Sequence, residues 1–354
     1  MSIFKKTITK FIAFILILLV ILSIFFYWSW HVKQLNKAKG FYYVYKGDKS
    51  YKINKLNKAI NYYNQGLNFY PEHTKARCNL GNIFVRYEDF YSAVNSYETA
   101  LKYKPDFIIC RMNLGIIESE KLANYDSAII QYDTIIKTKP RIIQIPLIFS
   151  NWKSTKQNKA IASYNKGLAY RGKSLYMGEG TRISKQYLEK AEEAYKYAAK
   201  TLKKSYNTHY NLALTNHLLG DYKEAGLMYC KAINIEPMNF DAHYNLGILL
   251  AHLGRNKEAL IEFEKAAMLL DLSGDSTKTK YIYDVISEVN QKISLDGDYE
   301  FLKTRDVSNT NTNNSDIILK NGKISFYKKD DSKFKHYMKT CVSKDFFKDY
   351  GIDE

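Results

Sequence analysis

The residues from Gly167 to Ser174, GLAYRGKS, have the spacing of a phosphate-binding loop. In that loop, backbone N–H groups surround the phosphates, the lysine contacts the outer phosphates, and the final hydroxyl binds magnesium. Such a loop must follow a buried strand, but the preceding residues, KAIASYNK, are typical of a helix. We therefore interpret Lys173 and Ser174 as helix residues and expect no nucleotide cofactor.

Other residues that could perform chemistry are few. His209 and His243 lie 34 residues apart, and two histidines alone do not complete a zinc site. No Ser-His-Asp or Cys-His grouping has local support. The four cysteines show no C-x-x-C spacing and no regular pairing, so they predict neither a metal site nor a compartment: Cys78, Cys110, Cys230 and Cys341. The sequence therefore predicts no catalytic residue, no metal, no cofactor and no enzyme activity.

One apolar segment must place the chain relative to a membrane. The run from Phe11 to Trp30 has no charged residue over 20 positions. A helix of that length spans about 30 Å, the thickness of a bilayer's hydrocarbon core. Trp28 and Trp30 suit the lipid–water interface, and no small-residue cleavage site follows them. We predict an uncleaved single-pass anchor over 11–30, behind a short tail over 1–10.

The charge distribution gives less information about orientation and partners. The formal net charge is +17, which fits an anionic partner without identifying one, and we expect no nucleic acid. Lysines lie on both sides of the apolar run, so the positive-inside rule favours an inside N-terminus from one side and an outside N-terminus from the other. Because large domains can cross a membrane despite their charge, we expect the bulk of the chain outside the cytoplasm. The lysine-rich stretch Lys33–Lys58 is a candidate contact for anionic lipid.

The rest of the chain is organised by a repeat of 34 residues. A Leu-Gly or Leu-Ala pair recurs at that spacing in two parts of the chain: Leu80-Gly81 and Leu114-Gly115, then Leu212-Ala213 and Leu246-Gly247. An alanine, an aromatic residue and a second alanine follow at fixed distances: Ala93, Tyr97 and Ala100; Ala225, Tyr229 and Ala232; Ala259, Phe263 and Ala266. This pattern resembles the tetratricopeptide repeat family, a helix–turn–helix unit. The resemblance implies an all-α, right-handed α-solenoid of about six units, preceded by one transmembrane helix.

The repeat gives the following expected organisation. Units lie at about 31–73, 74–107, 108–142, 158–205, 206–239 and 240–273, with an insertion at 143–159, a capping helix at 274–302, and a linker and tail at 303–354. The first unit starts directly after the apolar run, so anchor and repeat can form one continuous helix. In the irregular unit 158–205, Gly167 takes the place of Gly81. Asn321-Gly322 predicts a hairpin over 317–327, and the Lys-rich end predicts a short docking helix.

An asparagine precedes each Leu-Gly or Leu-Ala pair, and one lies at the matching place of the irregular unit: Asn79, Asn113, Asn165, Asn211 and Asn245. In tetratricopeptide repeats this face of the first helix lines a concave groove. A row of carboxamides offers donors and acceptors together, and can pair with the backbone of an extended peptide. Lys75 and Arg86 would add positive charge near Asn79. The alternative hypothesis is that the asparagines bond the neighbouring helix.

These observations predict a membrane-tethered protein–protein interaction scaffold. We expect it to dock a partner protein or extended peptide in the groove during assembly of an envelope complex. One alternative is a nucleotide-dependent accessory protein that uses Gly167–Ser174, and another is a protein that binds anionic lipid surfaces. A fold does not by itself establish a function, so the choice depends on the geometry of the site.

Overall fold

The computed structural model describes residues 2–139, 148–295, 317–320, 323–326, 332–341 and 344–349. Its helices are α1 (Ser2–Lys52), α2 (Leu56–Phe69), α3 (Thr74–Arg86), α4 (Phe90–Tyr103), α5 (Ile108–Glu120), α6 (Tyr125–Lys137), α7 (Ile148–Tyr176), α8 (Arg182–Ala199), α9 (Tyr206–Leu219), α10 (Tyr222–Ile235), α11 (Phe240–His252), α12 (Asn256–Ser273), α13 (Ser276–Leu295), α15 (Ser332–Lys339) and α16 (Lys344–Asp349). The strands β1 (Ile317–Lys320) and β2 (Lys323–Phe326) pair antiparallel, as the predicted hairpin requires.

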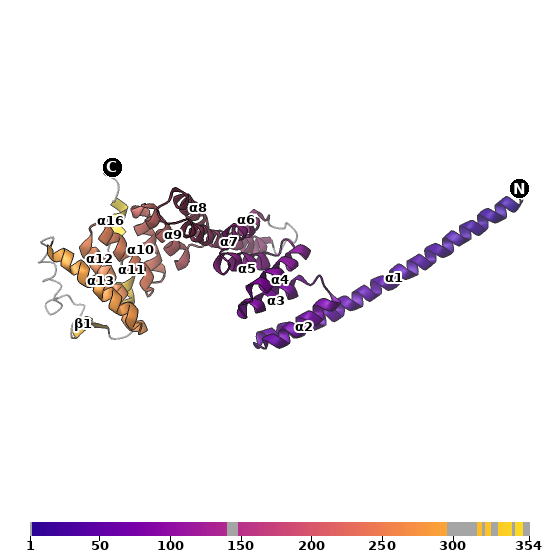
Figure 1. Cartoon of the computed structure of the whole chain (residues 1–354), viewed down its shortest axis with the longest axis horizontal. Coiled ribbons are helices and arrows are strands. Elements are labelled where there is room, and N and C mark those ends of the chain that lie inside the picture. The colour runs from indigo at the N-terminus through magenta and orange to yellow at the C-terminus, as the bar shows by residue number, and fades with distance from the viewer. Residues whose placement is uncertain are drawn as a thin grey trace. The chain divides into compact units, whose positions relative to one another are not determined.

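Consecutive helices pack against each other, which confirms the all-α array of helix pairs (Figure 1). The most extensive packing joins α1 to α2, α3 to α4, α7 to α8, α9 to α10 and α11 to α12. Contacts divide the chain into two compact parts, each of several repeats: residues 1–131, called unit 1 below, and residues 132–354, called unit 2. Each is described by itself.

Each pair is held together where a small residue of the first helix meets an aromatic ring of the second. A Cβ atom on Gly81 would lie 2.5 Å from Cε1 of Tyr97, and one on Gly247 would lie 2.7 Å from Cε1 of Phe263. The absence of a side chain on the glycine is therefore what allows the two helices to approach. The rings fill the space inside the pairs and are buried: Tyr63, Tyr97, Tyr195, Tyr229 and Phe263.

Side-chain caps and left-handed glycines set the ends of several helices. Asp89 and Asp221 precede α4 and α10, and each carboxylate accepts a hydrogen bond from a backbone N–H in the first helical turn. Gly220 and Gly254 have positive φ angles, 86° and 72°, in the turns that connect the two helices of a pair. The 34-residue spacing of these turns explains the 34-residue repeat of the sequence.

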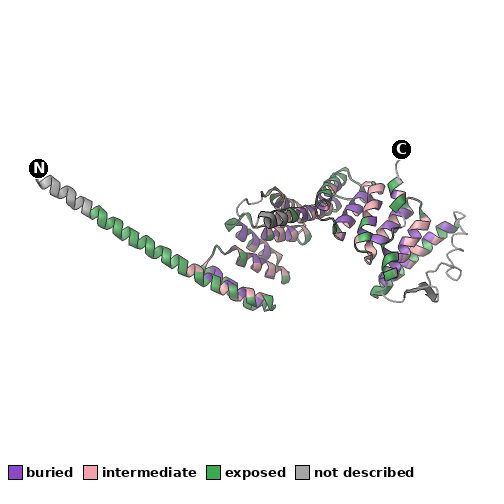
Figure 2. Ribbon diagram, turned by 180° about the vertical axis from the view of Figure 1, so that it is seen from behind, coloured by how far each residue is buried: buried purple, intermediate pink, exposed green. Residues whose placement is uncertain are grey.

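Helix α1 runs without interruption from the apolar segment into the first repeat, as the sequence suggested. At its end Val44 is buried, and a Cβ on Gly47 would lie 2.6 Å from the ring of Tyr63. From Phe14 onward the apolar part is exposed along its length (Figure 2). Among the described residues, this is the one helix long and apolar enough to cross a membrane.

The irregular unit owes its extra length to longer helices. Helix α7 has 29 residues and α8 has 18, whereas α3 to α6, α9 and α10 have 13 or 14 each. The predicted insertion at 143–159 is therefore helical from Ile148 onward. Parts of the predicted organisation lie outside the described residues: the start of the insertion at 143–147, the end of the capping helix at 296–302, the first part of the linker and tail at 303–316, and the turn Asn321-Gly322.

The described C-terminal helices pack against helices of the repeats. Helix α13 packs on α12, and the short helices α15 and α16 both contact α10. Cys341, between the two short helices, forms a disulfide with Cys230 of α10, with a Cα–Cα distance of 5.4 Å. This pairing was not predicted from the sequence, because the two cysteines are 111 residues apart and follow no recognisable spacing.

Candidate functional site

The asparagines of unit 1 direct their N–H groups toward the preceding first helix. Asn79 donates to a carboxylate oxygen of Asp48 at 3.0 Å and to the hydroxyl of Tyr63 at 3.1 Å. The ammonium of Lys75 lies 2.7 Å from the other Asp48 oxygen. Arg86 donates to the side-chain oxygen of Asn54 at 2.7 Å and is exposed. Lys75 is thus paired with an internal carboxylate, so its charge is partly compensated.

The same arrangement recurs one repeat later, with Asn82 in place of Asp48. The side-chain oxygen of Asn82 accepts hydrogen bonds from the hydroxyl of Tyr97 and from Nδ2 of Asn113, both at 2.8 Å. Asp48 and Asn82 each follow a repeat glycine, and they are 34 residues apart. Our sequence prediction missed both residues, although this spacing could have revealed them.

A pocket of about 230 Å³ opens beside the Asn82–Asn113 bond. It is lined by Asn82, Val85, Tyr97, Asn113, Ile116 and Ile117. Among the described residues, nothing bonds Nδ2 of Asn82 or Oδ1 of Asn113. The pocket therefore combines a free amide donor, a free carbonyl acceptor and apolar walls. That combination matches a peptide group followed by an apolar side chain.

In unit 2 the asparagines use their N–H groups in the same way, with tyrosines as acceptors. Asn245 donates to the hydroxyl of Tyr210 at 3.0 Å and to the backbone oxygen of Asp241 at 2.8 Å. Asn211 donates to the hydroxyl of Tyr164 at 3.0 Å and to its own helix, and Nη1 of Arg171 donates to Oδ1 of Asn211 at 2.5 Å.

The five asparagines are therefore not equivalent. Asn211 is fully bonded, and Asn165 is buried. Among the described residues, none donates to the side-chain oxygens of Asn79, Asn113 and Asn245. The alternative hypothesis, that the asparagines bond the neighbouring helix, therefore holds for their side-chain N–H groups. The three side-chain carbonyl oxygens can still accept a hydrogen bond from a ligand.

The segment Gly167–Ser174 lies inside α7, so its backbone N–H groups are part of a helix and not of a loop. The Ser174 hydroxyl is buried, 2.7 Å from that of Ser184, and the Lys173 ammonium lies 4.8 Å from the ring centroid of Tyr187. The helical interpretation of this segment is confirmed, and the geometry of a phosphate-binding loop is not present.

The two repeat histidines are buried structural side chains. His243 lies between a carboxylate oxygen of Glu262, 2.7 Å from Nδ1, and the backbone oxygen of Pro237, 3.1 Å from Nε2. Nε2 of His209 lies 3.0 Å from the backbone oxygen of Lys203, and its Nδ1 has no partner among the described residues. Burial lowers the pKa of His209, which favours the neutral ring.

The described residues contain no group of three or more His, Cys, Asp or Glu side chains that could hold a metal ion. The first-helix face offers hydrogen bonding, ion pairing and apolar contact. Such a face is suited to binding.

Comparison with known proteins agrees with this description. A family model described as "Tetratricopeptide repeat" matches residues 74–107 and 240–269, and one described as "TPR repeat" matches residues 217–254. A search of curated proteins found no match.

Two solved structures share the fold. PilW, described as a widely conserved type IV pilus biogenesis factor, is 17% identical with a TM-score of 0.52; the match covers 69% of this chain and 98% of PilW. PilF of Pseudomonas aeruginosa is 15% identical with a TM-score of 0.52, covering 70% of this chain and 98% of PilF. At such identities the likeness concerns the fold alone. The repeat pattern, the packed helix pairs and the family-model matches together identify the chain as a tetratricopeptide repeat protein.

Proposed function

We propose that this protein is a membrane-anchored scaffold that holds an extended segment of a partner protein on its first-helix face. Tetratricopeptide repeats support a role in protein–protein interaction, and the pocket beside Asn82 and Asn113 supports the mode of binding. The free Nδ2 donor and the free Oδ1 acceptor can pair with one peptide group. Val85, Ile116 and Ile117 can then receive an apolar side chain next to it.

The anchor is the second part of the proposal. The exposed apolar surface of α1 between Phe14 and Trp30 has the length and composition of a membrane span. Because α1 continues into the first repeat, a membrane that holds its apolar part would also hold the repeats near the surface. A cleaved signal sequence would have to be cut within this continuous helix.

The Cys230–Cys341 disulfide supports a location of the repeats outside the cytoplasm. Structural disulfides persist in oxidising compartments and are rare in the cytosol. We include assembly of an envelope complex in the proposal by analogy with PilW, whose similarity concerns only the fold.

The two alternatives have weaker support. A nucleotide function needs a loop where α7 has a helix. A lipid surface would use the lysines of Lys33–Lys58, but the ammonium of Lys46 lies 4.5 Å from the ring centroid of Tyr42, and that of Lys37 lies 5.2 Å from Tyr70. These amines already contact aromatic rings of the protein itself.

Site-specific photo-crosslinking tests the proposal. A benzophenone side chain at Ile116, inside the pocket, should capture a partner segment in intact cells. The same group at Tyr91, exposed on the second helix α4, should capture none of it. Capture of the same segment at equal yield from both positions would contradict a specific first-helix site.

A titration with the captured segment as a synthetic peptide completes the test. Asn113→Ala should weaken binding about two- to tenfold, because one neutral hydrogen bond contributes about 0.5–1.5 kcal/mol. Asn211→Ala is the matched control, because this carboxamide is fully bonded within unit 2. Equal affinities for wild type and the Asn113 variant would rule out the proposed hydrogen bonds.

A further inference from the structure

We propose that residues 332–341 and 344–349 form a C-terminal strap that the Cys230–Cys341 disulfide holds over a buried charge cluster, and that a dithiol reductant opens it. The strap consists of α15, Thr340, Cys341 and α16. The charge cluster consists of His243, Glu262 and Lys265. This inference concerns the C-terminal end of unit 2 and is independent of the proposed peptide site.

The strap packs into unit 2 through two apolar side chains. Phe347 of α16 is fully buried, and a Cβ atom on Gly226 of α10 would lie 2.3 Å from its ring. Met338 of α15 is also fully buried, and it packs against Met268 and Leu269 of α12. Each of the two short helices thus packs on unit 2 through one fully buried apolar side chain.

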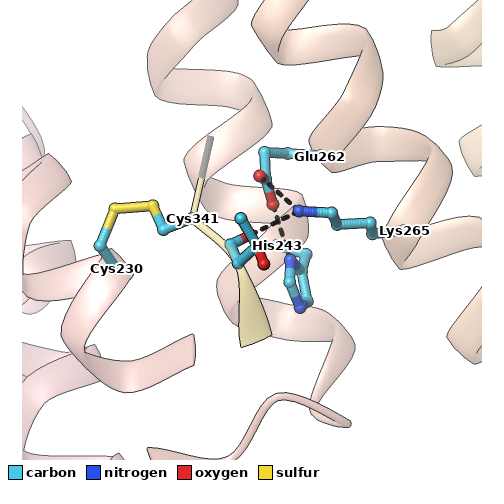
Figure 3. The surroundings of a disulfide bond; sticks show 6 residues. Cys230, His243, Glu262, Lys265 and Cys341 are labelled. Atoms are coloured by element: carbon cyan, nitrogen blue, oxygen red, sulfur yellow. Dashed lines mark hydrogen bonds and ion pairs between the residues drawn. A yellow bond between two sulfur atoms is a disulfide. The ribbon is translucent and has the colours of Figure 1, made fainter. Parts of the chain in front are cut away.

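The strap also completes the burial of a charge. The ammonium of Lys265 donates to Glu262 at 3.0 Å and to the backbone oxygen of Thr340 in the strap at 2.7 Å (Figure 3). It lies 5.1 Å from the ring centroid of Tyr337, also in the strap. Lys265 is fully buried, whereas Lys231, at the same position of the preceding repeat, is exposed. The contacts of Lys265 with Thr340 and Tyr337 of the strap are one difference between the surroundings of the two lysines.

Within the cluster, a carboxylate compensates the charge of the buried Lys265 ammonium. The preceding repeat has no carboxylate at that position, and its lysine is exposed. The carboxylate of Glu262 bonds both Lys265 and His243, and the corresponding residue 34 positions earlier is Met228. Burial alone would raise the pKa of Glu262, but the hydrogen bonds and charges of His243 and Lys265 outweigh it and hold this pKa below its usual value. An ionised carboxylate therefore faces the ammonium under the strap.

The disulfide is placed to control this arrangement. Cys341 directly follows Thr340, whose backbone oxygen accepts from Lys265, so the covalent bond fixes that acceptor. The two strap helices have eight and six residues. Helices shorter than about 12–15 residues are marginal in water, so the strap depends on its packing and on the disulfide to stay in place.

Opening needs a reductant, which the proposal names as a dithiol. One thiolate of the dithiol attacks a sulfur of the disulfide and displaces the other sulfur as a thiolate. The second thiol of the reductant then resolves the mixed disulfide. The Cys230–Cys341 bond gains two electrons and two protons to give two thiols, and the dithiol is oxidised to its own disulfide. Cys341 is the accessible partner, because it is half-buried and Cys230 is buried.

Acetylation of lysines in the full-length chain, in mild detergent, measures whether the strap is closed. In the oxidised protein an amine-reactive ester should modify Lys231 readily and Lys265 at least about tenfold more slowly, because the latter reacts only through local opening. After treatment with dithiothreitol the rate at Lys265 should rise by at least about tenfold, with Lys231 unchanged. Mass spectrometry gives both rates from one sample, and a retained helical signal shows that the array stays folded.

Two variants separate the disulfide from other effects of the reductant. Cys341→Ser should make Lys265 reactive without dithiothreitol. Cys110→Ala removes a free cysteine of unit 1 and should behave as wild type. If Lys265 stays unreactive in the reduced protein and in the Cys341 variant, packing alone holds the strap and the proposal is wrong. Rapid modification of Lys265 in the oxidised protein would overturn it as well.

Discussion

Hydrogen-bond partners at single positions distinguish otherwise similar repeats. In unit 1 the buried tyrosines Tyr63 and Tyr97 of the second helices donate their hydroxyl hydrogen bonds, to Asp48 and Asn82 respectively. The hydroxyls of Tyr195 and Tyr229 in unit 2 are buried with no partner among the described residues. The residue after the repeat glycine or alanine explains the difference, because it is Asn82 in the repeat of Tyr97 and Leu214 in the repeat of Tyr229.

Removing these hydroxyls should therefore have opposite effects. Tyr97→Phe should lower the free energy of unfolding by about 0.5–1.5 kcal/mol, because a made hydrogen bond is lost. Tyr229→Phe should leave it unchanged or raise it by up to about 1 kcal/mol, because an unpaired buried hydroxyl is removed. Guanidinium titrations of the two variants in the same detergent provide the measurement. An equal loss of stability in both would mean that Tyr229 has an acceptor.

His209 should make stability depend on pH. Burial lowers its pKa in the folded state and outweighs the opposing effect of the hydrogen bond to the Lys203 carbonyl, and the charge of the nearby Lys231 lowers the pKa a little further. The unfolded chain, with a histidine pKa of about 6.5, therefore binds more protons below that pH. Its contribution to stability is complete above about pH 6.5 and is lost as the pH falls toward the folded pKa.

The variant His209→Phe puts an aromatic ring that does not titrate into the same position. Its melting temperature should fall less than that of the wild type between about pH 7.5 and pH 5.5. His73 and His217 also have pKa values lowered by burial, so the variant should keep part of the slope. Identical slopes for variant and wild type would show that His209 is not protonated on unfolding in this range.

At the scale of elements, the distance between paired helices depends on the small residue in the first helix. Gly247→Leu should lower the free energy of unfolding by about 1–3 kcal/mol or more, since the added side chain would overlap the ring of Phe263. Lys231→Leu, at an exposed position of α10, is the control and should change stability by less than about 0.5 kcal/mol. A variant at Gly247 that melts like the wild type would mean that the ring moves aside at no cost.

The helix pairs could be predicted from the sequence, because the 34-residue spacing of Leu-Gly pairs, alanines and aromatic rings reflects contacts within one pair. The strap could not, since its disulfide and its bond to Lys265 join residues 111 and 75 positions apart. The hydrogen-bond partner of each asparagine carboxamide could not be predicted from the sequence either, because it depends on which side chain of the preceding repeat lies next to it. Asn113 meets an amide oxygen, and Asn245 meets a tyrosine hydroxyl.

At the scale of the whole molecule, the sequence leaves the orientation in the membrane undecided, because lysines flank the apolar part of α1 on both sides. The disulfide adds an independent argument. A bond between Cys230 and Cys341 persists where thiols are oxidised, and a chain with its repeats in the cytosol would keep both cysteines reduced. Together with the ability of large domains to cross despite positive charge, this favours an inside N-terminus and an outside array.

Reporter fusions test that orientation. Alkaline phosphatase, which folds only in an oxidising compartment, should be active when fused after Glu354, and a cytosolic fluorescent reporter at the same position should be dark. Because the strap ends five residues before the fusion point in the sequence, the Cys341→Ser version of the fusion serves as a control. It should stay active, since orientation depends on α1. Blocking free thiols before lysis should leave Cys230 and Cys341 unlabelled in the native chain. An inactive phosphatase with labelled cysteines would place the repeats in the cytosol, where the strap would be open.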